Sequence, residues 1–403
     1  MSGFNPNGYD PNFGVNGEQE QDPNRQDNPN RTNNGGRDLQ TDQINYAYQI
    51  LKRQLDTPEA FDFENPQKSL FSNFFKEPTY ALHLTSIDWS IESNNAFFDN
   101  DSIKLRYALN SNTLVCAIAF NSTGDLFSFS NGRTLFILDS NDCSLILNYA
   151  LPHYVKQIEM HTRVLKFSPD NKYIALNGSC YRILVYSLEE NTFVGSLEGH
   201  YDVVSSILFT SDSKYMLTGG YDGVICVWSF PDFTLVKRIE YNMNEERQSI
   251  VSLALSNDDQ YLFISFLSGA VGLCNSSFTV PMNTIIEYQD SLLRSSLSNN
   301  NKMIATASKD NTLKIWDIQD LVVCKQNLIG HTSFVVSCCF SPNDEYLFSG
   351  SKDESIKLWK QETGELLCTI HAHKNTVFQI EHHPRRNSFL TCGGDGILCM
   401  WDY

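Results

Sequence analysis

The fold is decided by residues 330–360, which read GHTSFVVSCCFSPNDEYLFSGSKDESIKLWK. Apolar and polar residues alternate over 334–340, and turn residues separate this run from two shorter ones at 346–349 and 355–359. Period-two alternation between short turns predicts three antiparallel β-strands. A sheet this small cannot bury both of its faces alone, so we expect it to stack on copies of itself.

Copies of this segment recur along the chain and place a tryptophan, or an apolar or small residue, at one position every 42 to 48 residues. The residues at this position are Leu138, Tyr186, Trp228, Cys274, Trp316, Trp359 and Trp401. A period of about 40–45 residues with Gly-His early and Trp-Asp late resembles the WD repeat, which forms one four-stranded propeller blade. Seven copies therefore predict an all-β, seven-bladed WD-repeat propeller.

The composition predicts a soluble intracellular protein with no membrane segment. The net charge is −17, which repels phosphate backbones, so we expect basic protein partners and no direct nucleic-acid binding. The apolar runs are too short to cross a bilayer, and the first ten residues lack the pattern of a secretory signal. The eleven cysteines show no Cys-x-x-Cys spacing, which indicates buried thiols rather than disulfides or a zinc site.

The part of the chain before the propeller divides into three predicted segments. Residues 1–38 are rich in Asn, Gly and Pro, which predicts a disordered tail. Residues 39–57 are predicted to form a short amphipathic helix. Within it, 41–56 either mediates self-association or binds a partner, or else it packs on the propeller or folds only partly. Residues 58–84 form an aromatic-rich linker that lies along the propeller or under a partner. The propeller itself is expected at 85–403.

The ends of the propeller are expected to meet. A further strand follows each full repeat, but only two residues follow Trp401. The segment 101–109, DSIKLRYAL, lies before the first repeat and has the alternation of a strand. We expect it to supply the missing strand of the last blade, which closes the ring and removes an exposed sheet edge.

His331, Ser349 and Asp353 have the composition of a hydrolase triad, yet the set recurs in several repeats and always accompanies a tryptophan such as Trp359. The resemblance to WD repeats implies a buried hydrogen-bond chain from Trp through Ser or Thr to His and Asp within a blade. The expected members are His200, Thr218, Asp222, Trp228, Thr306, Asp310, Trp316, His331, Ser349, Asp353, Trp359, His373, Thr391, Asp395 and Trp401. We interpret this set as structural and not catalytic.

Other residues with metal-binding or phosphate-binding potential give weak signals. His371 and His373, and the pair His382 and His383, could be read as metal ligands, but His373 already belongs to an expected hydrogen-bond chain and a His-x-His pair is a weak metal signal. A Gly-rich phosphate loop is absent. We therefore predict no enzyme activity, no cofactor and no metal.

Several motifs resemble the TUP/Groucho-type general transcriptional corepressors. Asp88-Trp89 precedes the closing strand, and LVCAIAF at 114–120 opens the first repeat. The second repeat carries HTRVLKFSPD at 161–170, and the likeness covers roughly residues 80–403. The resemblance implies that short hydrophobic repressor motifs bind the top face of the propeller and contact an arginine of blade two, here Arg163.

The top face is the side where the start of each first strand meets the turn after each second strand. Repeat register places twelve residues there: Leu114, Cys116, His161, Arg163, Val203, Tyr221, Leu293, Lys309, Phe334, Val336, Lys352 and Phe378. Apolar and aromatic residues with a few cations are typical of peptide-binding surfaces.

Together these patterns predict a nuclear corepressor scaffold, with the cytoplasm as the alternative location. Its propeller would bind peptide motifs of DNA-bound repressors and link them to chromatin factors, including basic histone tails. The alternative is a WD-repeat adaptor of another complex, such as a ubiquitin ligase, a histone-modifying complex or a trafficking complex. A catalytic function would need an assembled site that the sequence does not supply.

Overall fold

The computed structural model of the 403-residue chain describes residues 82–94, 102–132, 134–151, 162–178, 181–243, 246–275, 283–286, 290–318 and 324–403. One unit of the fold runs from Thr79 to Tyr403. The predicted tail, the predicted helix and the linker up to residue 81 lie outside the described residues. Across the described ranges, no helix has the length and apolar character needed to cross a membrane.

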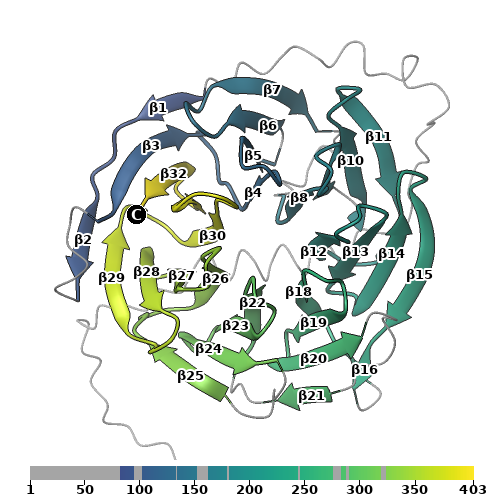
Figure 1. The fold of residues 1–403 in the computed structure, drawn as a ribbon. Helices are drawn as coiled ribbons and strands as arrows, with labels where there is room; N and C mark the ends of the chain where they lie inside the picture. The colour runs from purple at the N-terminus through teal and green to yellow at the C-terminus, as the bar shows by residue number, and fades with distance from the viewer. Residues whose placement is uncertain are drawn as a thin grey trace, which may run out of the picture. The chain divides into compact units, whose positions relative to one another are not determined.

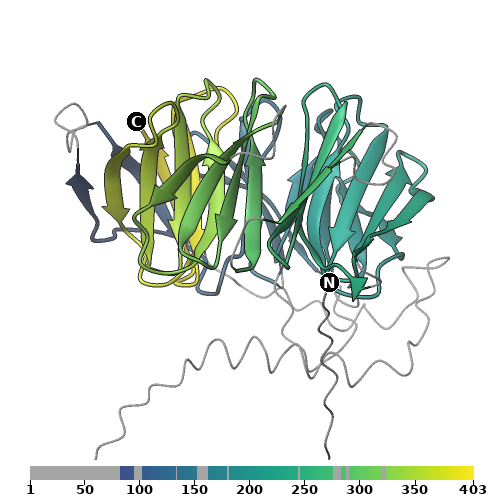
Figure 2. The same cartoon turned by 90° about the horizontal axis from the view of Figure 1, so that it is seen from below.

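This unit is a seven-bladed β-propeller, in which seven sheets are arranged as a ring around a central axis (Figure 1). Within each blade, consecutive strands are antiparallel neighbours, so each blade is a meander that starts at the axis and ends at the rim. The strands run between the two faces of the ring (Figure 2). Both faces of a blade contact other blades, which explains why the second and third strands of each blade are buried at most positions.

The first three blades follow each other directly along the chain. From the axis outward, blade one contains β4 (Ala117–Phe120), β5 (Leu126–Ser130), β6 (Thr134–Asp139) and β7 (Leu145–Ala150). Blade two contains β8 (Leu165–Phe167), β9 (Tyr173–Asn177), β10 (Ile183–Ser187) and β11 (Thr192–Leu197). Blade three contains β12 (Val204–Phe209), β13 (Tyr215–Gly220), β14 (Val224–Ser229) and β15 (Thr234–Glu240). A small hairpin of β16 (Asn242–Met243) and β17 (Glu246–Arg247) then leads to blade four.

The remaining blades repeat the pattern. Blade four contains β18 (Ile250–Leu255), β19 (Tyr261–Phe266), β20 (Ala270–Asn275) and β21 (Asn283–Ile286), and blade five contains β22 (Leu292–Leu297), β23 (Met303–Ser308), β24 (Thr312–Asp317) and β25 (Cys324–Ile329). Blade six contains β26 (Val335–Phe340), β27 (Tyr346–Ser351), β28 (Ser355–Lys360) and β29 (Leu366–His371). Blade seven contains β30 (Val377–His382), β31 (Ser388–Gly393) and β32 (Ile397–Asp402).

Blade seven is completed by a strand from the other end of the unit. The segment that we expected to close the ring forms β3 (Lys104–Asn110), which pairs antiparallel with β32 and places Leu105 opposite Trp401. The guanidinium of Arg106 donates from Nε to a carboxylate oxygen of Asp402 at 2.8 Å, beside this junction. The first and last parts of the propeller are therefore hydrogen-bonded within one sheet.

Two further strands were not expected from the sequence. β1 (His83–Thr85) pairs with β3, and β2 (Ser90–Ser93) pairs with β29, so blades seven and six have five strands each. β1 begins at His83, two residues before the residue at which we expected the propeller to start. Trp89, between these two strands, packs edge-on against Trp401 with ring centroids 5.3 Å apart.

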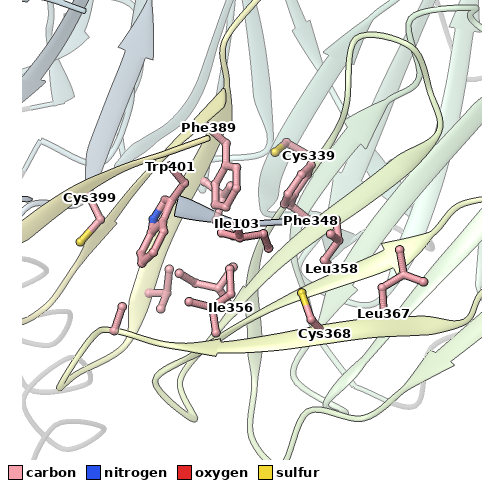
Figure 3. Close-up of a cluster of buried hydrophobic side chains, with 14 of the residues drawn as sticks. Ile103, Cys339, Phe348, Ile356, Leu358, Leu367, Cys368, Phe389, Cys399 and Trp401 are labelled. Carbon is pink, nitrogen blue, oxygen red and sulfur yellow. The ribbon is translucent and has the colours of Figure 1, made fainter. Parts of the chain in front are cut away.

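The core lies between neighbouring blades and not within one sheet. Between blades six and seven, Phe348 and Ile356 pack with Phe389 and Trp401 in one buried cluster (Figure 3). Ile103, just before β3, is 1% exposed in the same cluster. Burying a large apolar side chain contributes roughly 1.5–3 kcal/mol, so each blade-to-blade contact is a main source of stability.

Blades one, two and four lack the tryptophan and fill its position differently. Leu138, Tyr186 and Cys274 occupy it and are fully buried. In blade four the hydroxyl of Tyr241 contacts the thiol of Cys274 at 3.2 Å. All ten described cysteines are thiols, and eight are buried, so they mostly pack as small apolar side chains.

Candidate functional site

Blade six contains a continuous chain of hydrogen bonds between four side chains. Trp359 Nε1 donates to Ser349 Oγ at 2.8 Å. His331 Nε2 lies 2.8 Å from the same oxygen, and His331 Nδ1 lies 2.9 Å from a carboxylate oxygen of Asp353. Asp353 also accepts the backbone N–H of Thr332 at 2.8 Å. The chain connects the loop before the blade to its second and third strands.

The same arrangement recurs in blades three and seven, and partly in blade five. Complete chains are formed by Trp228, Thr218, His200 and Asp222, and by Trp401, Thr391, His373 and Asp395. In blade five Trp316 donates to Thr306 at 2.8 Å, whereas Asp310 accepts from the backbone and hydroxyl of Thr312. The structure therefore brings together the complete predicted sets of blades three, six and seven.

Electrostatics assign the direction of each bond in blade six. Burial lowers the pKa of His331, so its ring is neutral; Nδ1–H donates to Asp353 and Nε2 accepts from the hydroxyl of Ser349. Burial alone would raise the pKa of Asp353, but the hydrogen bond from His331 holds it well below its usual range. Ser349 is fully buried and already accepts from Trp359. Its hydroxyl is thus a structural link that a substrate cannot reach.

Four segments of the chain, 191–229, 281–317, 322–360 and 364–402, match the family described as WD domain, G-beta repeat. Each segment contains the last strand of one blade and the first three strands of the next blade, which carries the tryptophan. The chain is a WD-repeat protein. Blades one, two and four of its seven blades lack the tryptophan.

Relatives of this WD-repeat protein have diverse names. It is 25% identical over 199 residues to Transcription factor unc-37 of Caenorhabditis elegans, which covers 47% of this chain and 30% of that protein. It is 25% identical over 219 residues to Autophagy-related protein 16 of Arabidopsis thaliana, covering 54% and 42%. Protein LST8 homolog of Dictyostelium discoideum is 27% identical over 203 residues, covering 40% and 67%. The first two matches span less than half of those relatives.

The top face of the WD propeller is the side on which the inner strands begin. There, the turn after a second strand donates a backbone hydrogen bond to the residue before an inner strand. Lys352 donates to Phe334 and Tyr221 to Val203, both at 2.9 Å, and Lys309 makes the equivalent bond in blade five. The ammonium of Lys352 also lies 5.3 Å from the ring centroid of Phe334, a cation–π contact.

One register position near the start of the inner strand can be identified in every blade. Five inner strands contain a β-bulge near their start, and a bulged residue has no ladder partner, so its side chain is re-aimed. In blade six, Ser349 is paired with Cys338 of the inner strand, and the residue two positions before Cys338 is Val336. The same count in each blade, starting from the position equivalent to Ser349, gives one residue per blade. We call these seven residues the axial ring: Cys116, Arg163, Ser205, Val251, Leu293, Val336 and Phe378.

Blades five to seven give the axial ring an apolar side. Val336 is partly exposed, whereas Val335 before it is fully buried, and Leu293 and Phe378 are partly exposed in the same way. These three predicted residues therefore share one position in adjacent blades. Ser205 and Val251 complete the ring but were not predicted, because a bulge has no signature in a single repeat; comparing the register of all seven repeats would have identified them.

Arg163 gives the axial ring its only cation. Its backbone N–H donates to Asn177 Oδ1 at 2.7 Å, its side chain is exposed, and no described carboxylate pairs with it. Burial raises the pKa of the neighbouring Cys116 thiol to about 12, and the positive charge of Arg163 opposes that rise. The thiol is therefore not a nucleophile, and the arginine remains available to a ligand.

The other predicted top-face residues surround the axial ring. Leu114 is partly exposed two residues before Cys116, and the pairs Val203–Tyr221 and Phe334–Lys352 lie where inner strands begin. His161 lies outside the described residues.

The histidine pairs do not converge on a common point. His382 Nε2 lies 2.8 Å from the hydroxyl of Tyr403, while His383 Nδ1 accepts backbone N–H groups. His371 lies 3.6 Å from a carboxylate oxygen of Glu92, and His373 belongs to the hydrogen-bond chain of blade seven. Within the described ranges, no three His, Cys, Asp or Glu side chains are grouped to hold a metal ion.

Proposed function

We propose that this WD-repeat protein is a nuclear, non-enzymatic corepressor scaffold whose top face binds short apolar peptide segments of DNA-bound repressors. The observation that carries the proposal is the apolar part of the axial ring. Leu293, Val336 and Phe378 are all partly exposed there, and they belong to the adjacent blades five, six and seven. Exposed apolar side chains at one position of three adjacent blades suit the anchor residues of a peptide. Arg163 supplies a cation across the ring.

The corepressor function is supported by the resemblance to the TUP/Groucho type and by the likeness to a protein named a transcription factor. The negative net charge suits basic partners such as histone tails. A second candidate is an adaptor subunit of another complex. It is supported by likenesses of similar identity to Autophagy-related protein 16 and the LST8 homolog.

A tethered reporter assay tests the proposal. The full chain is fused to a heterologous DNA-binding domain, and transcription is measured from a promoter that carries the corresponding site. We expect the wild-type fusion to repress transcription, and Val336→Asp and Arg163→Ala to relieve the repression. The matched control is Val236→Asp, which makes the same chemical change at an exposed position of β15 on the outer edge of blade three.

Each result has a distinct meaning. Repression that Val336→Asp abolishes and Val236→Asp retains supports the corepressor scaffold and its top-face site. Repression that both variants retain, with unchanged melting temperatures, places the site elsewhere on the propeller. A well-expressed nuclear fusion that leaves transcription unchanged overturns the corepressor function and favours the adaptor.

A further inference from the structure

The residue after each axial-ring residue usually connects its blade to the next one. In four blades it carries a hydrogen-bond acceptor that binds a backbone N–H of the following blade, at 2.9 to 3.2 Å. These connecting residues are Ser206, Ser252, Ser337 and Gln379. In these four blades the side chain satisfies a backbone N–H of the next blade. The equivalent residues of blades one and two, Ala117 and Val164, have no side-chain acceptor.

In blade five this position is occupied by Arg294, the one charged residue among the seven. It stands opposite Ala307 just as Ser337 stands opposite Gly350, so the two residues occupy the same register position. A guanidinium has only donors, so Arg294 cannot accept the N–H of the next blade. Among the described residues its side chain has neither a hydrogen bond nor an ion pair, and it is partly buried.

The charge of Arg294 acts on thiols of blades six and seven. Burial raises the pKa of the Cys338 thiol to about 12, and the charge of Arg294 opposes this rise. The same charge acts on Cys392 of blade seven, which also interacts with Cys116 of blade one. Arg294 directly follows the apolar ring residue Leu293 in β22.

An arginine in this position destabilises the folded protein unless an opposite charge compensates it. The other cation of an inner strand in this region, Lys166, is paired with Glu381 at 2.6 Å. A partly buried, unpaired charge loses hydration without gaining a partner. A carboxylate brought in by a ligand would restore both the ion pair and the hydrogen bonds, as arginine and carboxylate form paired, charge-assisted contacts.

We propose that Arg294 binds a carboxylate side chain, Asp or Glu, of the peptide that docks on the axial ring. This inference rests on the proposed peptide-binding function and adds the chemistry of the partner. The apolar side chains of the peptide contact Leu293, Val336 and Phe378, and its acid pairs with Arg294. The net charge of −17 repels a peptide with many acids, so the partner carries a single acid within an apolar segment.

A peptide-library experiment tests the pairing. The full-length protein is bound to synthetic heptapeptides with Phe, Ile and Leu at fixed positions and one variable position carrying Asp, Glu, Asn, Gln, Lys or phosphoserine. We expect the wild type to prefer Asp or Glu over Asn or Gln by about tenfold, and Arg294→Gln to remove that preference while still binding the neutral peptides. The matched control, Arg385→Gln, removes the same charge from the turn after β30, at the other end of that inner strand.

The outcomes separate this inference from the proposed function. If Val336→Asp abolishes binding but the wild type shows no preference for acids, peptide binding stands and the role of Arg294 is overturned. If Arg385→Gln removes the preference as well, the effect is one of net charge and the inference fails. A preference for phosphoserine alone overturns the carboxylate. If the wild type binds no peptide of the library, both the proposed function and this inference are overturned.

Discussion

Lys166 on β8 and Glu381 on β30 form an ion pair in which Nζ lies 2.6 Å from Oε1, although blade one stands between their blades. The residue at the same register position in blade one is Ala119, whose small side chain is fully buried. Gln379 supports the pair by donating from Nε2 to the other carboxylate oxygen of Glu381 at 3.1 Å. The ion pair therefore connects blade two to blade seven across the inner edge of blade one.

This connection predicts coupling between the two residues. Both side chains are mostly buried, so Lys166→Met and Glu381→Gln should each lower the free energy of unfolding by about 2–4 kcal/mol, because each leaves an unpaired charge or acceptor. The double variant should cost less than the sum, with a coupling energy of about 1–3 kcal/mol. Urea unfolding of the four proteins measures this cycle. Strictly additive effects would show that the pair contributes nothing.

The hydrogen-bond chains predict that one hydroxyl stabilises two partners. Thr391→Val removes the hydroxyl and leaves both Trp401 Nε1 and His373 Nε2 unpaired inside blade seven. We expect a loss of about 2–4 kcal/mol in the free energy of unfolding. Thr391→Ser keeps the hydroxyl and removes a methyl group, so it should cost only about 1 kcal/mol. Equal losses in the two variants would argue that packing, and not hydrogen bonding, is what this residue provides.

His382 predicts a loss of stability in acid. Burial lowers its pKa to about 4, and its ring donates to the carbonyl of His383 and accepts from Tyr403 only when neutral. The unfolded chain, with an ordinary histidine pKa, binds this proton at a higher pH than the folded chain, so stability falls as the pH drops from about 6.5 to about 4. A shift of this size corresponds to about 3 kcal/mol.

The variant His382→Gln provides the measurement. It retains a donor and an acceptor but does not titrate, so its free energy of unfolding should vary less between pH 7 and pH 4 than that of the wild type. The wild type should keep its advantage at pH 7 and lose it near pH 4. Parallel pH profiles for the two proteins would assign the acid sensitivity to other groups, among them His331, whose pKa burial also lowers.

The repeat itself could be predicted because it depends on residues that recur. The indole N–H of Trp359 and of its equivalents needs a buried hydrogen-bond acceptor. Tryptophan, a hydroxyl residue, histidine and aspartate therefore recur at fixed spacing, and each set can be recognised within a single repeat. The fifth strands β1 and β2 could not be predicted, because HLT and SIES are too short to establish a periodic pattern and are largely exposed. They form because β3 and β29 offer them a hydrogen-bonding edge.

The candidate site was only partly predictable for a different reason. Leu293, Val336 and Phe378 stood out as apolar residues at strand starts, but their common geometry comes from bulges that depend on the pairing partner. The ion pair of Lys166 and Glu381 joins residues 215 positions apart, and sequence spacing within one repeat holds no information about it. Contacts between distant blades therefore required the structure.

Ring closure gives the last prediction. Deleting residues 99–109 removes most of β3, the buried side chains of Ile103, Ala108 and Leu109, and the strand to which β1 pairs. The lost apolar burial amounts to several kcal/mol, so we expect the melting temperature to fall by about 10 °C. The deletion also leaves β32 as an unpaired sheet edge, which should promote aggregation on heating.

A synthetic peptide with the sequence of residues 101–110 distinguishes a missing strand from a damaged chain. If β32 needs only a partner strand, adding this peptide to the deletion variant should raise its melting temperature in a concentration-dependent manner, because a ligand that binds the folded state stabilises it by mass action. A scrambled peptide of the same composition should have no effect. A deletion variant that melts at the wild-type temperature would show that the antiparallel pairing of β3 with β32 contributes little to the closed ring.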